Sequence, residues 1–73
     1  MKIYYGEFER FGYTMHCIGT SSKEVKQALI NEYIKAYKQY NGVDPRKDGT
    51  DYYKIFLREL YIECRETGKV YWD

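Results

Sequence analysis

The sequence predicts an α+β fold in which a small antiparallel sheet packs on one long amphipathic helix. Three observations support this class: a helix with clear start and stop signals over residues 21–42, two strand-like segments before it, and alternating apolar segments after it. The expected order of elements is β-β-α-β-β. Because a chain of 73 residues can bury only one modest core, we expect a single domain over residues 1–73.

The first strand-like segments are residues 2–9 and 13–19, which are short and rich in β-branched and aromatic residues. Residues 10–12 between them include a glycine, which suits a tight turn, so the two segments predict a hairpin. Successive side chains of a strand point to opposite faces. The face of the second strand expected against the helix is the more apolar one, formed by Tyr13, Met15 and Cys17.

The long helix is predicted from its ends and from its apolar face. Ser21 and Glu24 have the spacing of a capping box, in which each side chain accepts from the backbone amide of the other residue. Asn41 and Gly42 mark the end, because both tolerate the left-handed conformation. The expected core face consists of Val25, Ala28, Leu29, Tyr33, Ala36, Tyr37 and Tyr40. A second stripe, which either widens the core face or contacts a partner, consists of Ile30 and Ile34.

After the helix, residues 43–50 predict a loop, because they contain the only proline, a glycine, two aspartates and two basic residues. This loop is either a binding loop or a plain connector. Residues 51–64 fit a helical face and a strand alternation equally well. We expect one or two helical turns near 51–58 and a strand over about 59–66. A turn at 67–68 and a last short strand over 69–72 then complete the sheet.

The composition argues against several classes of function. A formal net charge of +1 lacks the basic excess that usually accompanies nucleic-acid binding. The N-terminus has no apolar run typical of a signal peptide and no stretch is long enough to cross a membrane, so the expected location is the cytoplasm. In that compartment the two cysteines, Cys17 and Cys64, are expected to be free, small core residues rather than a disulfide.

No group of residues predicts catalysis. His16 is the only histidine, and Cys17 beside it would point to the opposite face of the strand, so the two cannot act as nucleophile and base. Cys64 would reach His16 only if their strands were adjacent. Three glycines are expected singly at turns or strand ends, so they do not form a phosphate-binding loop; they are Gly6, Gly12 and Gly19. We therefore expect no enzyme activity, no cofactor and no metal site.

The chain contains ten tyrosines, and this excess has two interpretations. Either the small core is built from tyrosines whose hydroxyls reach solvent, or part of the aromatic surface binds a partner. Adjacent tyrosines cannot both point inward from a strand, so some of them should be exposed. The candidate partner-binding residues are Tyr4, Tyr13, Tyr52, Tyr53 and Tyr61, together with Arg46 and Lys47 in the loop over 43–50.

Three stretches of the sequence carry a resemblance to known proteins. They are a hairpin that ends on Cys17-Ile18-Gly19-Thr20-Ser21-Ser22, a long helix rich in Lys, Ile and Tyr, and the segment Gly68-Lys69-Val70-Tyr71-Trp72-Asp73. Together they resemble small accessory proteins of phages and mobile elements of low-GC bacteria. That group includes anti-CRISPR and other anti-defence inhibitors. The resemblance implies inhibition without catalysis, by covering a working surface of a host protein.

Three hypotheses about function therefore stand. The leading one is a non-enzymatic protein that binds and inhibits a host protein complex, as a monomer or a homodimer. The second is a single-stranded nucleic-acid-binding protein in which sheet tyrosines such as Tyr4, Tyr13 or Tyr61 stack on bases. The third is a small-ligand binder whose pocket forms between subunits.

Overall fold

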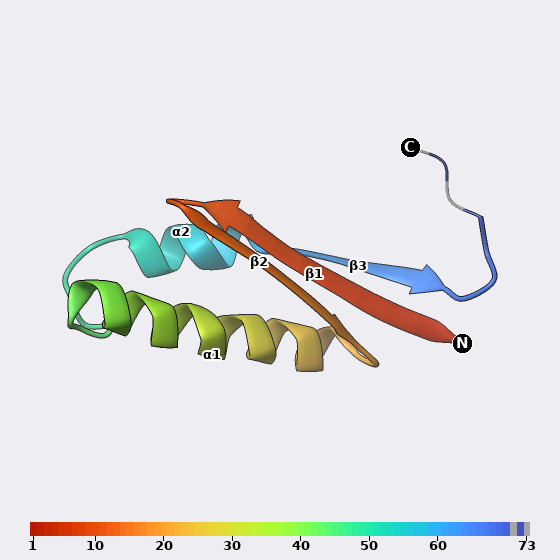
Figure 1. The fold of residues 1–73 in the computed structure, drawn as a ribbon, viewed down its shortest axis with the longest axis horizontal. Coiled ribbons are helices and arrows are strands. Elements are labelled where there is room, and N and C mark those ends of the chain that lie inside the picture. Colours follow the sequence, from red (N-terminus) through yellow and green to blue (C-terminus); the bar gives the residue numbers. More distant parts are fainter. Residues whose placement is uncertain (71, 73) are drawn as a thin grey trace.

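The computed structural model describes residues 1–70 and residue 72. Within these described residues, two helices and three strands follow in the order β-β-α-α-β (Figure 1). They are β1 (Lys2–Arg10), β2 (Tyr13–Gly19), α1 (Ser22–Asn41), α2 (Tyr52–Glu59) and β3 (Tyr61–Glu66). The α+β class is confirmed, and so are the hairpin and the long helix. The predicted β-β-α-β-β order and the single helix are wrong, because residues 52–59 form a second helix. The helical turns expected near 51–58 and the strand expected over about 59–66 are confirmed by α2 and β3.

The predicted last strand is also missing from the described part of the chain. Lys69, Val70 and Trp72 are in no strand, and Tyr71 lies outside the described residues. In the turn over 67–68, Gly68 has a positive φ, of 80°, but Thr67 does not. The type I′ turns that join hairpin strands need positive φ at both central residues, so this turn does not start a hairpin. The Thr67 amide instead donates to the carbonyl of Met1 (2.8 Å), which continues the pairing of β3 with β1.

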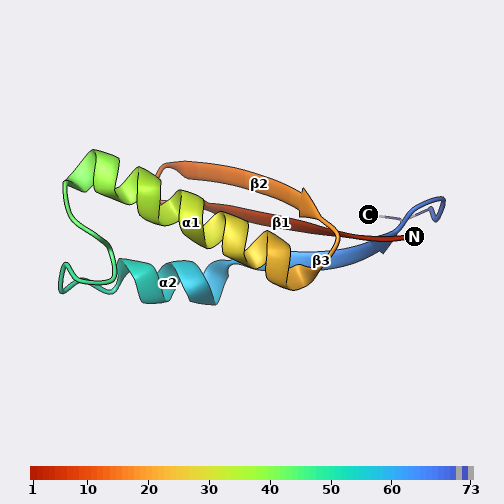
Figure 2. The same ribbon diagram turned by 90° about the horizontal axis from the view of Figure 1, so that it is seen from below.

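The three strands form one antiparallel sheet in the order β2-β1-β3. Figure 2 shows α1 lying across one face of this sheet, with α2 beside it on the same side. Gly6 pairs with Cys17 on one side and with Ile62 on the other, so these three residues share the helix-covered face. Thr14, His16 and Ile18 lie on the open face, as predicted from the alternation.

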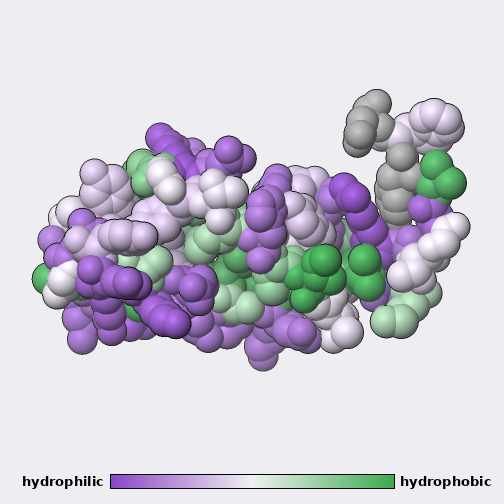
Figure 3. Space-filling view, in the orientation of Figure 1, coloured by the Kyte–Doolittle hydropathy of each residue, from purple (hydrophilic) through white to green (hydrophobic). Residues whose placement is uncertain are grey.

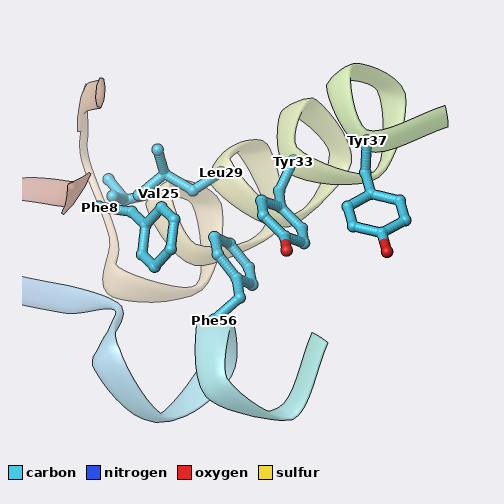
Figure 4. Close-up of a cluster of buried hydrophobic side chains, with 6 residues drawn as sticks. All are labelled: Phe8, Val25, Leu29, Tyr33, Tyr37 and Phe56. Atoms are coloured by element: carbon cyan, nitrogen blue, oxygen red, sulfur yellow. The ribbon is translucent and has the colours of Figure 1, made fainter. Parts of the chain in front are cut away.

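Side chains of α1, α2 and β1 meet in one core (Figure 4). Its buried members are Phe8, Val25, Leu29, Tyr33, Tyr37 and Phe56. The rings of Tyr33 and Phe56 stack at 4.1 Å, which joins the two helices. Ala28 and Tyr40, both predicted on the core face, are exposed instead. Ile30 packs against the core, whereas Ile34 is half-buried.

Two glycines bring α1 close to the sheet. Gly6 lies in the middle of β1, and not at a turn or strand end as predicted. A Cβ atom at Gly6 would overlap Val25 and lie 2.8 Å from Leu29 Cδ1. A Cβ atom at Gly19 would lie 2.9 Å from Val25 Cγ2. The absence of side chains at these two positions therefore sets the close approach of the first half of α1 to the sheet.

Both predicted end signals of α1 are present. The Ser21 hydroxyl accepts from the Glu24 amide at 3.1 Å, which is one half of the predicted capping box. The Glu24 carboxylate accepts from the Thr20 hydroxyl (2.9 Å). At the other end, Gly42 has a φ of 76° and its amide donates to the Lys38 carbonyl, so the helix ends in a left-handed cap.

Candidate functional site

Exposed aromatic side chains gather at the end of the molecule where the hairpin turn meets the last turn of α1 and the first turn of α2. We call Phe11, Tyr13, Tyr40 and Tyr52 the aromatic end surface, in which Tyr13 is half-buried against the core and the other three are exposed. Its rings form two pairs, with centroid distances of 5.0 Å between Phe11 and Tyr52 and 6.2 Å between Tyr13 and Tyr40. The core rings of Tyr33 and Tyr37 connect the two pairs. Tyr40 is 77% exposed, and Tyr52 and Phe11 are about 40% exposed. Large apolar rings are thus left in water on three different elements.

The local backbone places Phe11 at this surface. Phe11 and Gly12 form the two-residue turn of the hairpin, and both have positive φ, of 58° and 84°. These angles match a type I′ turn, in which glycine or asparagine is the usual choice at both positions. A phenylalanine in the left-handed region carries a backbone cost. Its ring is held by edge contact with Tyr52 and by the Arg10 guanidinium, 4.9 Å from the ring centroid.

A small cavity of about 190 Å³ lies beneath the aromatic end surface. Its lining residues are Phe11, Tyr13, Tyr33, Tyr37, Asn41 and Tyr52. The Tyr33 hydroxyl is buried and has no hydrogen-bond partner among the described residues. Burial raises the pKa of Tyr33 to about 12, so the hydroxyl stays protonated at neutral pH. The cavity is therefore walled by five aromatic rings and by the polar side chain of Asn41.

The loop over 43–50 is tied down beside this surface. Asp44 accepts hydrogen bonds from the backbone amide of Arg46 (2.8 Å) and from its guanidinium (3.0 and 2.6 Å). The side-chain hydrogen bond from Arg46 is the main cause that holds the pKa of Asp44 well below its usual range. The Tyr37 hydroxyl donates to Asp48, which also accepts from Thr50. These bonds make the loop part of the folded surface, in which Asp44 neutralises the charge of Arg46.

The structure separates the residues that were predicted to bind a partner. Tyr13 and Tyr52 belong to the aromatic end surface. Tyr4 and Tyr53 are half-buried and pack against the core. Tyr61 is half exposed on the open face of the sheet. Arg46 and Lys47 are exposed in the loop over 43–50.

Two residues of the aromatic end surface, Tyr40 and Phe11, are not among the candidate partner-binding residues predicted from the sequence. Tyr40 follows the helical spacing of the core residues, but it lies in the last turn of α1, beyond the sheet and the core. For Phe11 the sequence predicts a position in the hairpin turn and no binding role. An aromatic residue directly before the turn glycine was the available signal, since the left-handed conformation disfavours bulky residues.

The open face of the sheet carries a hydrogen-bonded polar network. The Tyr5 hydroxyl lies 3.0 Å from a Glu7 carboxylate oxygen and 2.6 Å from His16 Nδ1. The Tyr61 hydroxyl donates to Glu63 (2.9 Å), and this bond is the first cause of its raised pKa. The carboxylates that hold these tyrosines would repel phosphate groups, so this face is poorly suited to stacking nucleic-acid bases.

The structure also separates the tyrosines named for base stacking from one another, and it separates the two residues considered as a catalytic pair. Tyr4 and Tyr13 lie on the helix-covered face, so of the three tyrosines named for base stacking Tyr61 alone faces outward. His16 and Cys64 lie on strands separated by β1 and on opposite faces of the sheet, so they cannot pair as base and nucleophile. Within residues 1–70 and 72, no group of three His, Cys, Asp or Glu side chains could hold a metal ion.

Comparisons with protein-family models, curated proteins and solved structures gave no match. Among the described residues, neither helix has the length and apolar character needed to span a bilayer.

Proposed function

We propose that this chain is a non-catalytic protein-binding module that blocks a host protein complex by direct contact through the aromatic end surface. The supporting observation is the gathering of exposed Phe11, Tyr40 and Tyr52 at one end of the molecule, where Phe11 and Tyr52 line the cavity of about 190 Å³ and Phe11 and Tyr40 line an adjoining hollow. Tyrosine is enriched at the centres of protein interfaces because a large ring buries much apolar area at a small entropic cost. This mode of action is also the one implied by the resemblance to anti-defence inhibitors.

The position of the surface strengthens the proposal. Its rings come from the hairpin turn, α1 and α2, and the core beneath them is made of aromatic side chains in edge-to-face and stacked contact. A rigid surface loses little conformational freedom on binding, which favours affinity. The tied loop over 43–50 supplies a polar rim beside it, as expected of an interface with an apolar centre.

The proposal is tested by affinity capture from a bacterial lysate with the tagged protein, with and without nuclease. We expect one host protein to be recovered stoichiometrically in both arms. Replacing Tyr40 and Tyr52 with alanine should reduce that recovery at least tenfold, since hot-spot residues each contribute about 2 kcal/mol or more. The matched control is Tyr61→Ala, which removes a half-exposed tyrosine from the open face and should leave recovery unchanged.

Two results would contradict this function. Equal recovery with the double variant and with Tyr61→Ala would show that the aromatic end surface is not the contact. Loss of recovery after nuclease treatment would identify a nucleic-acid-binding protein. Phe11→Asn is a further variant that keeps a residue tolerant of positive φ while it removes the ring, and it should also weaken capture.

A further inference from the structure

β2 is an edge strand whose outer side is available for pairing. Arg10 and Tyr13 close the two-residue turn, so they form a hydrogen-bonded pair, and the pairs Phe8–Met15 and Gly6–Cys17 follow in the same alternation. The residues between them turn their backbone N–H and C=O groups away from β1. Thr14, His16 and Ile18 therefore present backbone donors and acceptors along the outer edge of β2.

The two edges of the sheet differ in how they are protected. β3 carries Glu63, Arg65 and Glu66 among its six residues, and such charges hinder pairing with another strand. β2 has seven residues, Tyr-Thr-Met-His-Cys-Ile-Gly, without lysine, proline or carboxylate. Natural edge strands usually carry at least one protective feature. Because β2 has no such residue, its outer edge is open to pairing with another strand.

A groove runs between this edge and α1. It consists of two adjoining hollows of about 560 and 460 Å³ that share Thr14, Met15 and Glu32. The helix side of the groove includes two small residues, Ala36 in the first hollow and Ala28 in the second. Figure 3 shows hydrophobic side chains gathered near the middle of the face on which β2 lies in Figure 1. An added strand would place alternate side chains in this groove.

The charge of the groove favours one kind of occupant. Glu32 lines both hollows, and no lysine or arginine lines either one within the described chain. A second copy paired antiparallel through β2 would bring the two Glu32 carboxylates towards each other across the two-fold axis, which is unfavourable. A lysine or arginine from a different chain would instead complement Glu32.

We propose that the β2 edge binds an extended segment of a partner protein as a fourth strand, with apolar side chains in the groove and a basic side chain opposite Glu32. Backbone hydrogen bonds to Thr14, His16 and Ile18 supply affinity, and the groove selects alternate side chains. The inference rests on the proposed function, because it names the chemistry by which the host partner is held beside the aromatic end surface.

The probe for the test is the synthetic peptide Ac-Thr-Ile-Thr-Lys-Thr-Ile-Thr-NH₂, whose isoleucines and lysine would face the groove. With the ¹⁵N-labelled full chain and peptide at about 1 mM, which detects weak binding, we expect slower hydrogen exchange of the Thr14, His16 and Ile18 amides. Replacing the peptide lysine with glutamate should weaken binding at least tenfold. Glu32→Lys should reverse this preference, whereas Glu9→Lys, on the open face, is the matched control and should not.

A pair of N-methylated peptides tests the strand pairing itself. Methylation of the threonine amides removes the donors that face β2 and should abolish binding, whereas methylation of the lysine and isoleucine amides, which face away, should leave it. Three results would each overturn the inference: equal loss of binding with the two methylated peptides, unchanged hydrogen exchange at the Thr14, His16 and Ile18 amides, or a dimer of the free chain paired through β2. If host-protein capture persists in those cases, the proposed function stands and only this mode of binding is wrong.

Discussion

Tyr33 and Tyr37 lie one turn apart on α1 and face the same core, but their hydroxyls have opposite environments. The Tyr37 hydroxyl donates to the Asp48 carboxylate. The Tyr33 hydroxyl is buried with no partner among the described residues. An unsatisfied buried hydroxyl is destabilising, whereas a hydrogen bond to a charged group is stabilising. The same chemical change at the two positions should therefore have opposite effects.

We predict that Tyr33→Phe raises the free energy of unfolding by about 1 kcal/mol, because it removes a buried polar group without leaving a cavity. Tyr37→Phe should lower the free energy of unfolding, because Asp48 loses its donor. Denaturation in urea, followed by circular dichroism, measures both changes. Effects of the same sign in the two variants would contradict the assigned hydroxyl environments.

The stability of the protein at alkaline pH tests the same residue. Burial raises the pKa of Tyr33 in the folded state from its ordinary value of 10.0 to about 12. Below pH 10 this hydroxyl is protonated in both the folded and the unfolded chain, so its titration does not lower the free energy of unfolding. As the pH rises from 10 towards 12, the unfolded chain ionises before the folded protein, and the free energy of unfolding falls. We predict that the melting temperature of Tyr33→Phe falls less steeply between pH 10 and pH 12 than that of the parent protein. Parallel curves would show that Tyr33 ionises normally.

At the scale of elements, the contact between β1 and α1 depends on Gly6. A Cβ atom there would overlap Val25, so Gly6→Ala should force the helix outward or shift its side chains. Overpacking of this kind costs about 1–3 kcal/mol. A double-mutant cycle with Val25→Ala, measured by chemical denaturation, isolates the contact. We predict that Gly6→Ala costs less in the Val25→Ala background, and an equal cost in both backgrounds would rule out the steric explanation.

At the scale of the whole molecule, the strand order keeps the two cysteines apart. Cys17 on β2 and Cys64 on β3 are separated by β1, so about two strand spacings, roughly 10 Å, lie between them. A disulfide needs Cα atoms within about 7 Å. Both cysteines are free, as predicted, although Cys64 is exposed and not a core residue.

We predict that oxidation with diamide yields disulfide-linked dimers through Cys64 and no internal disulfide. Intact-mass spectrometry after alkylation of the unreduced protein should find both thiols modified, with Cys64 reacting first because it is exposed. A monomer lighter by two hydrogens that resists alkylation would contradict the strand order β2-β1-β3.

The sequence by itself determined the parts of this protein that depend on near neighbours. The hairpin follows from strand-forming residues on both sides of a turn glycine, and α1 follows from its 3.6-residue periodicity between Ser21 and Gly42. Each of these signals acts over a few residues, through hydrogen bonds and backbone angles that the chain makes with itself. The same reasoning correctly placed Tyr13, Met15 and Cys17 towards the helix.

The tertiary structure alone decided what depends on distant contacts. The pattern over residues 51–64 fits helix and strand equally well and indicates only one or two helical turns near 51–58, and the stacking of Phe56 on Tyr33 favours the complete helix α2. The sheet order and the exposure of Tyr40 and Phe11 arise because β1 pairs on both sides and α1 extends past the core. Burial is a property of the assembled layers, so the aromatic end surface and the open β2 edge exist only once hairpin, helices and β3 have packed together.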